Sequence, residues 1–484
     1  MENGIVTKDS ILNALTCRLK LSHFYTTTNE MQSIECLMAA SSTEMLEVVR
    51  VEREYITILK NMVVLLKTEN SGGYSNISLD HALLSSELSP ADKALTSALV
   101  YGVIERRITL DYIISKLSSR DIDKIDKETR CAIRIGLYQL RYMDRIPPHA
   151  AINETVSLCS RKSAGFVNAI LRAYTRLEAP VELPSKESAP ESYLSVAYSV
   201  CLPLAAKLVS AFGIDRAESL LAASFETPKT TLRVNTLSTT REALLEKIEG
   251  AEPTEISPVG LRVGGAVREL YGFDEGLFFV QDEASQIAVA AIGAKPGERV
   301  IDTCACPGSK SFGAAIDMQN RGELYSFDLH KSKLSLIESG AERLGIDIIS
   351  VAQGDARAFI PELESSADRV LCDVPCSGFG VISKKPELRY KDPAESAPLP
   401  DIQLAILKNA SRYVKVAGVL VYSTCTIFPE ENDKNIERFL ADSPNFELDG
   451  FSVGPFTQKN ETLSLYPDTH HTDGFFVARM VRRK

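Results

Sequence analysis

Two cysteines of this chain follow short apolar runs that have the composition of buried β-strands. The run at 369–373 ends in Asp373 and leads into Pro-Cys-Ser-Gly, which contains Cys376. The run at 419–423 leads into Thr-Cys-Thr, which contains Cys425. A thiolate can add to an electron-poor carbon, and a neighbouring thiol or carboxyl group can move a proton. The two segments therefore predict a site of covalent, thiol-based catalysis.

A loop of small residues follows another strand-like run, at 299–302. Its Gly308 lets the backbone approach a ligand closely, and the helix that should begin behind the loop can face an anionic group. The loop lacks the dinucleotide and P-loop glycine patterns. Asp328 and Asp355 lie at the ends of the next two strand-like runs, where they can accept hydrogen bonds from ribose hydroxyls and an adenine amine. Each acid alone can equally be a helix cap, but together they predict a nucleoside pocket with room for a charged tail.

Strand-like runs alternate with helical periods from residue 282 to the end of the sequence. The runs are 299–302, 323–328, 348–351, 369–373 and 419–423. This alternation predicts an α/β domain over 276–484, with a mostly parallel sheet covered by helices on both faces. Such sheets bind ligands at the carboxyl ends of their strands, where the cysteines and acids described above should meet.

The preceding part of the chain has a helical and basic character. Residues 46–180 predict an all-helical domain, and Ser89-Pro90 predicts a helix that begins with Ser at the N-cap and Pro at the first position. Between Lys93 and Arg176 there are 15 basic and 8 acidic residues, a local charge of +7 in a chain of net charge −10. This excess predicts a basic face that binds RNA phosphates, with a solvated charged surface as the alternative.

The remaining segments are less regular. Residues 1–45 show little periodicity and predict a poorly defined N-terminal extension. A polar, Pro-containing linker is expected at 185–190. It leads into a small α+β module at 190–275, in which one helix should run from 205 to 225.

Composition excludes several classes of protein. The chain has 484 residues, of which 44% are hydrophobic and 24% charged, an ordinary globular balance with room for several domains. It has no apolar run near the roughly 18 residues of a membrane span and no secretory signal pattern. We therefore expect no membrane association and a cytoplasmic location, where the 10 cysteines stay reduced. No CxxC occurs and the six His are dispersed, so no metal site is expected.

Three motifs together resemble those of a known family. They read Asp-Thr-Cys-Ala-Cys-Pro-Gly-Ser-Lys at 302–310, Asp-Val-Pro-Cys-Ser-Gly-Phe-Gly at 373–380 and Ser-Thr-Cys-Thr at 423–426, with Glu-Glu-Asn at 430–432. The sequence at these positions resembles the RsmB branch of the Nol1/Nop2/Sun RNA cytosine-5 methyltransferases. The resemblance covers about 48–484 and implies an all-α NusB-like N-terminal domain, a small α+β (RRM-like) module and a C-terminal Rossmann-like class I methyltransferase domain.

The resemblance also implies roles for individual residues. Cys425 would be the nucleophile, Cys376 would assist proton removal and product release, Asp373 would hold the cytosine edge, and Lys310 would lower the pKa of the nucleophilic thiol. In DNA cytosine-5 methyltransferases the Pro-Cys motif supplies the nucleophile, and that rule would select Cys376 instead. The methyl donor would be S-adenosyl-L-methionine. Its implied contacts are Cys304, Ala305, Cys306, Pro307, Gly308, Ser309, Lys310, Asp328, Asp355 and Asp373.

The resemblance implies a substrate as well. It points to 16S ribosomal RNA at the family position, cytosine 967, with a transfer RNA or another ribosomal cytosine as the alternative, and we expect a monomer. A basic aromatic segment formed by Lys384, Lys385, Arg389, Tyr390 and Lys391 should contact the RNA beside the site, with a solvated charged loop as the alternative. The donor loop departs from the usual family sequence at Cys306, Ser309 and Ser311. Because Ser309 replaces a more permissive Gly, this change predicts weaker donor binding.

Overall fold

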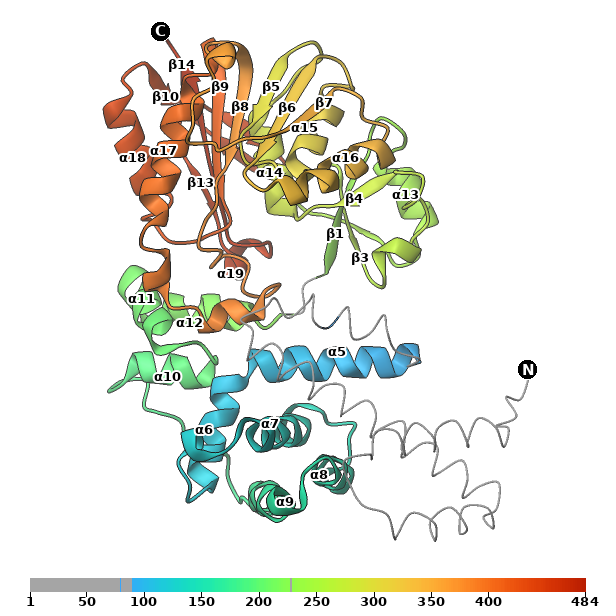
Figure 1. The fold of residues 1–484 in the computed structure, drawn as a ribbon, viewed down its shortest axis with the longest axis vertical. Coiled ribbons are helices and arrows are strands. Elements are labelled where there is room, and N and C mark those ends of the chain that lie inside the picture. Colours follow the sequence, from blue (N-terminus) through green and yellow to red (C-terminus); the bar gives the residue numbers. More distant parts are fainter. Residues whose placement is uncertain (1–78, 80–88, 227–228) are drawn as a thin grey trace, which may run out of the picture. The chain divides into compact units, whose positions relative to one another are not determined.

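The computed structural model describes residue 79 and residues 89–226 and 229–484. The predicted extension at 1–45 and the first part of the predicted helical domain lie outside these residues. The chain divides into two compact units, residues 1–182 and 183–484, and Figure 1 shows the elements of each. No helix within the described ranges is long and apolar enough to cross a membrane.

The described part of the first unit is helical, as predicted. Its helices are α5 (Pro90–Glu105), α6 (Arg107–Leu117), α7 (Lys127–Tyr142), α8 (Pro148–Ser157) and α9 (Arg161–Thr175). Ser89 caps α5, because its hydroxyl oxygen accepts a hydrogen bond from the backbone N–H of Asp92. Leu99, Leu110 and Leu171 are fully buried and form part of the core. The N-terminal signal at Ser89-Pro90 is thus confirmed.

The second unit begins with three short helices, α10 (Pro190–Ala197), α11 (Leu202–Phe212) and α12 (Ile214–Ala223). The prediction of a single helix over 205–225 was wrong. Gly213 separates α11 from α12 with φ of 76°, a backbone conformation that an α-helix cannot contain and that glycine adopts without strain.

A small antiparallel sheet follows these helices. Its strands are ordered β2 (Glu252–Pro253), β3 (Gly260–Val263), β1 (Thr230–Val234) and β4 (Phe278–Val280). Helix α13 (Arg241–Lys247) belongs to this module, and Leu244 packs with strand residues Leu232 and Leu261 in its core.

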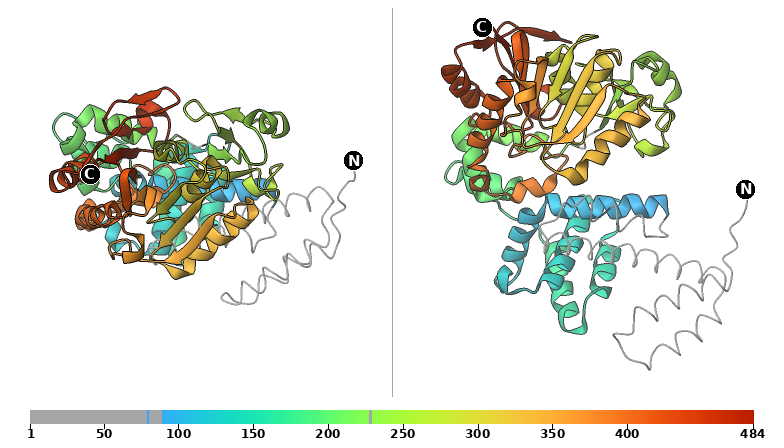
Figure 2. Two further views of the ribbon diagram at one scale, coloured as in Figure 1. Left: turned by 90° about the horizontal axis from the view of Figure 1, so that it is seen from above. Right: turned by 45° about the horizontal axis from the view of Figure 1, so that its top comes forward.

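The larger sheet has eight strands. Its order is β10 (Phe446–Leu448), β14 (Phe475–Arg482), β9 (Val414–Thr424), β8 (Ala367–Asp373), β5 (Arg299–Asp302), β6 (Glu323–Asp328) and β7 (Ile349–Gln353), with β13 (Leu463–Leu465) also paired to β14. Strands β9, β8, β5, β6 and β7 run parallel, and β14 is antiparallel to β9 (Figures 1 and 2). The predicted mostly parallel sheet is confirmed.

Alternate strand residues face two separate hydrophobic cores. Val300 and Leu371 pack with α14 (Glu283–Ile292), α15 (Ser309–Asp317) and α16 (Leu334–Arg343). Ile301 and Val370 pack with α17 (Leu399–Ser411) and α18 (Asp433–Asp442) on the other face. The sheet is therefore covered on both sides, and its parallel strands bring their carboxyl ends to one edge.

Candidate active site

The two predicted cysteines meet at the carboxyl ends of β8 and β9. These neighbouring strands run parallel, with Asp373 opposite Ser423, so the segments that follow them lie side by side. The Sγ atoms of Cys376 and Cys425 are 3.1 Å apart, and the backbone N–H of Cys425 donates to Cys376 Sγ at 3.3 Å. Two residues 49 positions apart thus form one thiol pair.

The two thiols differ in acidity. A hydrogen bond from the Cys376 thiol is the main reason that the pKa of Cys425 lies below its ordinary value, and the cations of Lys310 and Lys385 act in the same direction. Hydrogen bonding to Cys425, burial and the carboxylate of Glu431 hold the pKa of Cys376 well above its ordinary value. The pKa of Cys425 is thus lowered and that of Cys376 is raised, and these opposite directions favour Cys425 as the nucleophile.

A buried ion pair lies beside the thiols. Lys310 is only 9% exposed, and its Nζ lies 2.6 Å from Asp373 Oδ2. Burial alone would lower the pKa of Lys310, but the charge of Asp373 and its hydrogen bond outweigh burial and raise it. Ser423 Oγ donates to the other Asp373 oxygen at 2.7 Å. Lys310 therefore stays charged, and Asp373 is held in place at the strand end.

The predicted donor loop lies between the carboxyl ends of β5 and β6. The Cys306 backbone N–H donates to Asp328 Oδ2 at 3.2 Å, which ties the loop to the end of β6. Gly308 has φ of 111°, and a Cβ there would lie 2.5 Å from the ring of Phe312. Gly308 is buried, and a side chain at this position would collide with Phe312, so the turn that leads into α15 requires glycine. Ser309 begins α15 without a positive φ, so its replacement of glycine introduces no backbone strain.

The remaining predicted donor contacts have partners within the protein. Asp328 also accepts the backbone N–H of His330 at 2.9 Å. The Asp355 carboxylate accepts hydrogen bonds from the backbone and guanidinium of Arg357, with Arg357 Nη2 at 2.7 Å from Oδ2. Burial raises the pKa of the Cys304 thiol well above its ordinary value. Asp328 and Asp355 are thus positioned at successive strand ends, and their contacts with a nucleoside stay a prediction.

Asp302, the first residue of the 302–310 motif, should make the free energy of unfolding depend on pH. It is 1% exposed, and burial raises its pKa from the ordinary 3.8 to about 7. The folded protein holds this proton more tightly than the unfolded chain, so the contribution of Asp302 to stability falls as pH rises from 3.8 towards about 7. Relative to Asp302→Asn, the free energy of unfolding of the wild type should fall by about 2 kcal/mol between about pH 5.5 and pH 8. Urea unfolding at the two pH values measures this difference, and a constant difference would contradict the assignment.

The predicted RNA-contacting segment at 384–391 is mostly engaged within the protein. Arg389 is fully buried, and its guanidinium donates to oxygens of the α10–α12 region. Lys384 forms ion pairs with Asp282 and Asp473. The prediction that Arg389 contacts RNA was therefore wrong. Lys385 is exposed and acts on the pKa of Cys425.

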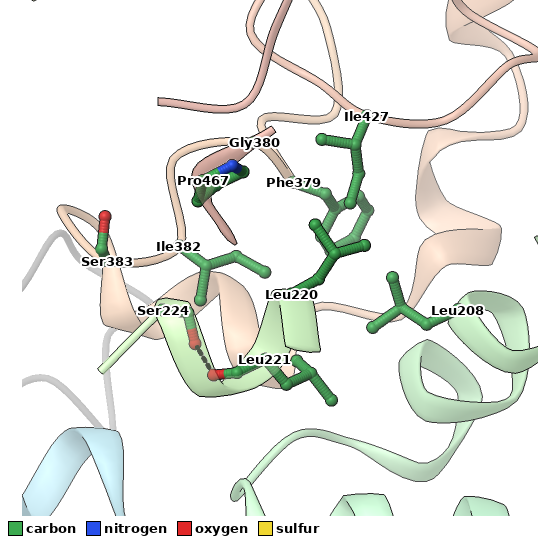
Figure 3. A pocket seen from close by; sticks show the side chains of 10 residues that line it. All are labelled: Leu208, Leu220, Leu221, Ser224, Phe379, Gly380, Ile382, Ser383, Ile427 and Pro467. Carbon is green, nitrogen blue, oxygen red and sulfur yellow. Dashed lines mark hydrogen bonds between the residues drawn. The ribbon is translucent and has the colours of Figure 1, made fainter. Parts of the chain in front are cut away.

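A small, mainly apolar cavity lies close to the thiol segments (Figure 3). Its lining residues are Leu208, Leu220, Leu221, Ser224, Phe379, Gly380, Ile382, Ser383, Ile427 and Pro467. No titratable side chain lines it, and the Gly380 backbone N–H donates to the carbonyl of Cys425 at 2.9 Å. The cavity thus lies beside the segments that carry the two thiols, and no acidic or basic side chain lines it.

Sequence reasoning gave no role to a set of buried polar residues around the thiols. They are Gln403, Glu431, Asn432 and Asn435. Glu431 and Asn432 belong to the Glu-Glu-Asn motif, whereas Gln403 lies in α17 outside every motif. The only sequence signal for Gln403 is a polar side chain on a helix face that is otherwise apolar. Across the described residues, the structure holds no cluster of His, Cys, Asp and Glu that could bind a metal.

Three family models match consecutive parts of the chain. Residues 53–176 match the NusB family, residues 204–268 match the ferredoxin-like domain of RsmF/B-like methyltransferases, and residues 289–481 match the 16S rRNA methyltransferase RsmB/F model. The order of the matches agrees with the expected order of domains.

Curated relatives are similar over most of their length. The chain is 36% identical over 440 residues to the probable ribosomal RNA small subunit methyltransferase B of Bacillus subtilis, a match that covers 87% of this chain and 97% of that protein. It is 32% identical over 415 residues to ribosomal RNA small subunit methyltransferase B of Klebsiella pneumoniae, covering 83% and 93%.

Solved structures share the fold. The crystal structure of PH0851 has a TM-score of 0.72 at 26% identity and covers 89% of this chain and 98% of its own. A methyltransferase homologue from Pyrococcus horikoshii has a TM-score of 0.53 at 26% identity and covers 62% and 100%. NSun6 from the same organism, solved with SFG, has a TM-score of 0.52 at 22% identity and covers 58% and 97%.

Proposed function

Because this chain belongs to the RsmB/F family of 16S rRNA methyltransferases, we propose that it methylates carbon 5 of cytosine 967 of that RNA through a covalent adduct with Cys425. The enzyme is an RNA methyltransferase that uses S-adenosyl-L-methionine. The observation that carries the proposal is the thiol pair, in which the Sγ atoms of Cys425 and Cys376 lie 3.1 Å apart behind two neighbouring parallel strands. The lowered pKa of Cys425 and the raised pKa of Cys376 support Cys425 as the attacking thiol.

The first step follows from the chemistry of cytosine. Carbon 5 is a poor nucleophile until a thiolate adds to carbon 6, which breaks the C5–C6 double bond and leaves its electron pair on carbon 5 as part of an enamine-like C4–C5 system. The Cys425 sulfur forms the new bond to carbon 6. Asp373, fixed by Lys310 and Ser423, is placed to hold the cytosine edge. Such a base must be unpaired or flipped out to reach the thiol.

We propose that the donor binds at the carboxyl ends of β5, β6 and β7. When bound, S-adenosyl-L-methionine supplies an electrophilic methyl group for carbon 5. The residues proposed to hold it are Cys304, Ala305, Cys306, Pro307, Gly308, Ser309, Lys310, Asp328, Asp355 and Asp373. The hydrogen bond that ties the loop to Asp328 and the two carboxylates at successive strand ends support this proposal.

Cys376 is suited to the final step. The largest cause of its raised pKa is hydrogen bonding to Cys425, and this interaction changes once the Cys425 sulfur is bonded to carbon. Cys376 then loses its proton to water more easily, and its thiolate takes the proton from carbon 5. The C5–C6 double bond re-forms and the Cys425 thiolate leaves. Cys376 thus resolves the adduct that Cys425 makes.

The helical unit supports the choice of RNA. Its excess of basic residues suits phosphate binding, and its NusB-family match accompanies the small-subunit methyltransferase match in one chain. We propose that this unit contributes to RNA binding and that the enzyme acts as a monomer in the cytoplasm.

Bisulfite sequencing tests the substrate. The enzyme and S-adenosyl-L-methionine are incubated with naked small-subunit RNA, with partly assembled small subunits and with transfer RNA, and Cys425→Ala is the control. We expect one newly protected cytosine in small-subunit RNA, at the family position, that is absent with the variant. Protection in transfer RNA alone would keep the chemistry and overturn the substrate.

A further inference from the structure

A buried polar clamp holds the two residues that flank Cys376. The side-chain Nε2 of Gln403, in α17, donates to the carbonyl of Pro375 at 2.9 Å and to Glu431 Oε2 at 2.8 Å. The same Glu431 oxygen accepts the backbone N–H of Ser377 at 2.9 Å. Gln403 and Glu431 therefore fix the backbone on both sides of Cys376 without touching Cys425.

The hydrogen-bond partners of the Gln403 side chain determine the orientation of its amide group. Oε1 accepts hydrogen bonds from Asn435 Nδ2 at 3.1 Å and from the Tyr422 hydroxyl at 3.3 Å. Asn435 is a donor at this contact, because its Nδ2 also bonds to the carbonyl of Pro400. The Pro375 carbonyl and the Glu431 carboxylate only accept, so the Gln403 oxygen faces Asn435 and Nε2 faces Pro375 and Glu431. Gln403 is fully buried.

Cys425 has a separate support. Asn432 Oδ1 accepts the Thr424 hydroxyl at 2.6 Å, and Asn432 Nδ2 donates to the Thr426 carbonyl at 3.0 Å. The two supports meet at a hydrogen bond between the hydroxyls of Ser377 and Thr426 at 2.8 Å and at the contacts of the two cysteines themselves. The Gln403 side chain bonds to the backbone beside Cys376 and not to the backbone beside Cys425, so its loss should displace Cys376 more than Cys425.

The clamp also places a carboxylate next to Cys376. Glu431 is 3% exposed, and its charge contributes to the raised pKa of the Cys376 thiol. A negative charge at this position favours the protonated thiol before attack and a strong base once the proton has left.

We propose that Gln403, acting through Pro375 and Glu431, is a positioning residue that aligns Cys376 for removal of the carbon 5 proton and release of the product. The inference rests on the proposed function, because it assigns the second half of that reaction to a clamp outside the motifs. Misplacement of a reacting group by about 1 Å can cost about 100-fold in rate.

The test separates adduct formation from adduct resolution. Gln403→Met, which keeps side-chain length but removes both hydrogen-bonding atoms, is mixed with labelled small-subunit RNA and S-adenosyl-L-methionine. Covalent protein–RNA complex is quantified on denaturing gels, and methylated RNA is measured over many turnovers. We expect adduct formation within about 3-fold of the wild type, a turnover reduced about 10- to 100-fold, and adduct that accumulates.

Two further variants serve as references for the amount of adduct that accumulates. Cys376→Ala gives the fully unresolved adduct, and Gln286→Met is the matched control, because Gln286 is an equally buried glutamine whose Nε2 bonds to the carbonyls of Leu232 and Gln281. Gln286→Met should turn over without accumulating adduct. Donor binding by each variant, measured at equilibrium, reports an intact fold.

Each outcome either supports or overturns the proposed role of Gln403. If Cys376→Ala accumulates adduct and Gln403→Met does not, the inference is overturned and the proposed function stands. A parallel loss of adduct formation and turnover in Gln403→Met, with donor binding retained, would also overturn it. If Cys376→Ala forms no adduct, both the proposed role of Cys376 and the inference fail. Should Gln403→Met not bind donor, Glu431→Met, which removes the acceptor of both clamp hydrogen bonds, takes its place, with accumulation supporting the clamp and its absence overturning it.

Discussion

Replacing Cys425 with alanine is expected to reduce methyl transfer by at least about 1,000-fold, because the variant lacks the group that activates carbon 5. A hydrogen bond from Cys376 and the cations of Lys310 and Lys385 lower the pKa of this thiol, which favours its ionised form. Incorporation of labelled methyl groups into small-subunit RNA measures the loss. Donor binding should be retained, since Cys425 lies outside the 302–310 loop.

Cys159→Ala is the control for this variant. Cys159 belongs to the helical unit, and burial raises the pKa of its thiol to about 11, so it is an inert thiol. Its replacement should leave methyl transfer within about 2-fold. Activity of Cys425→Ala near that of the wild type, with Cys376→Ala inactive and free of adduct, would reverse the roles of the two cysteines.

Replacing Cys376 with alanine is expected to have a different effect. Attack by Cys425 needs no atom of Cys376, although loss of the thiol hydrogen bond should raise the pKa of Cys425 and slow attack at neutral pH. Removal of the carbon 5 proton then lacks its base, and turnover should fall by about 100-fold or more. The variant should therefore convert up to one RNA per enzyme into a complex that survives denaturing electrophoresis.

The double variant Cys376→Ala/Cys425→Ala controls this experiment. It should give no denaturant-resistant complex, because neither thiol of the pair is left. A complex of equal yield from the double variant would mean that another nucleophile attacks the RNA, and would contradict the assignment of both residues.

The general architecture could be predicted from sequence because its signals are local. Apolar runs that alternate with helical periods identified all five parallel strands, and the rule that parallel strands share one carboxyl edge brought Asp373, Cys376 and Cys425 together. The antiparallel strands β10, β13 and β14 were not identified individually. The break between α11 and α12 was missed, since a single glycine within a helical pattern is compatible with either a continuous or a broken helix.

The site was harder to predict where it depends on long-range contacts. Arg389 resembles a solvent-facing RNA contact in sequence, yet the folded chain buries it under the α10–α12 helices. The choice between Cys376 and Cys425 rested on the family resemblance. The structure adds a physical reason, because the direction of each pKa shift depends on neighbours far away in sequence. Gln403 carries no motif, and only its contacts reveal its place in the site.

The most direct test of the central claim is to trap the adduct and identify the attached residue. A small-subunit RNA fragment with 5-fluorocytidine at the target position is incubated with the wild-type enzyme and S-adenosyl-L-methionine. Fluorine at carbon 5 cannot be removed as a proton, so the complex should persist after methyl transfer. Mass spectrometry of the digested complex should find the RNA attached to Cys425. Attachment to Cys376, or efficient methylation of unmodified RNA with no trapped complex, would contradict the account.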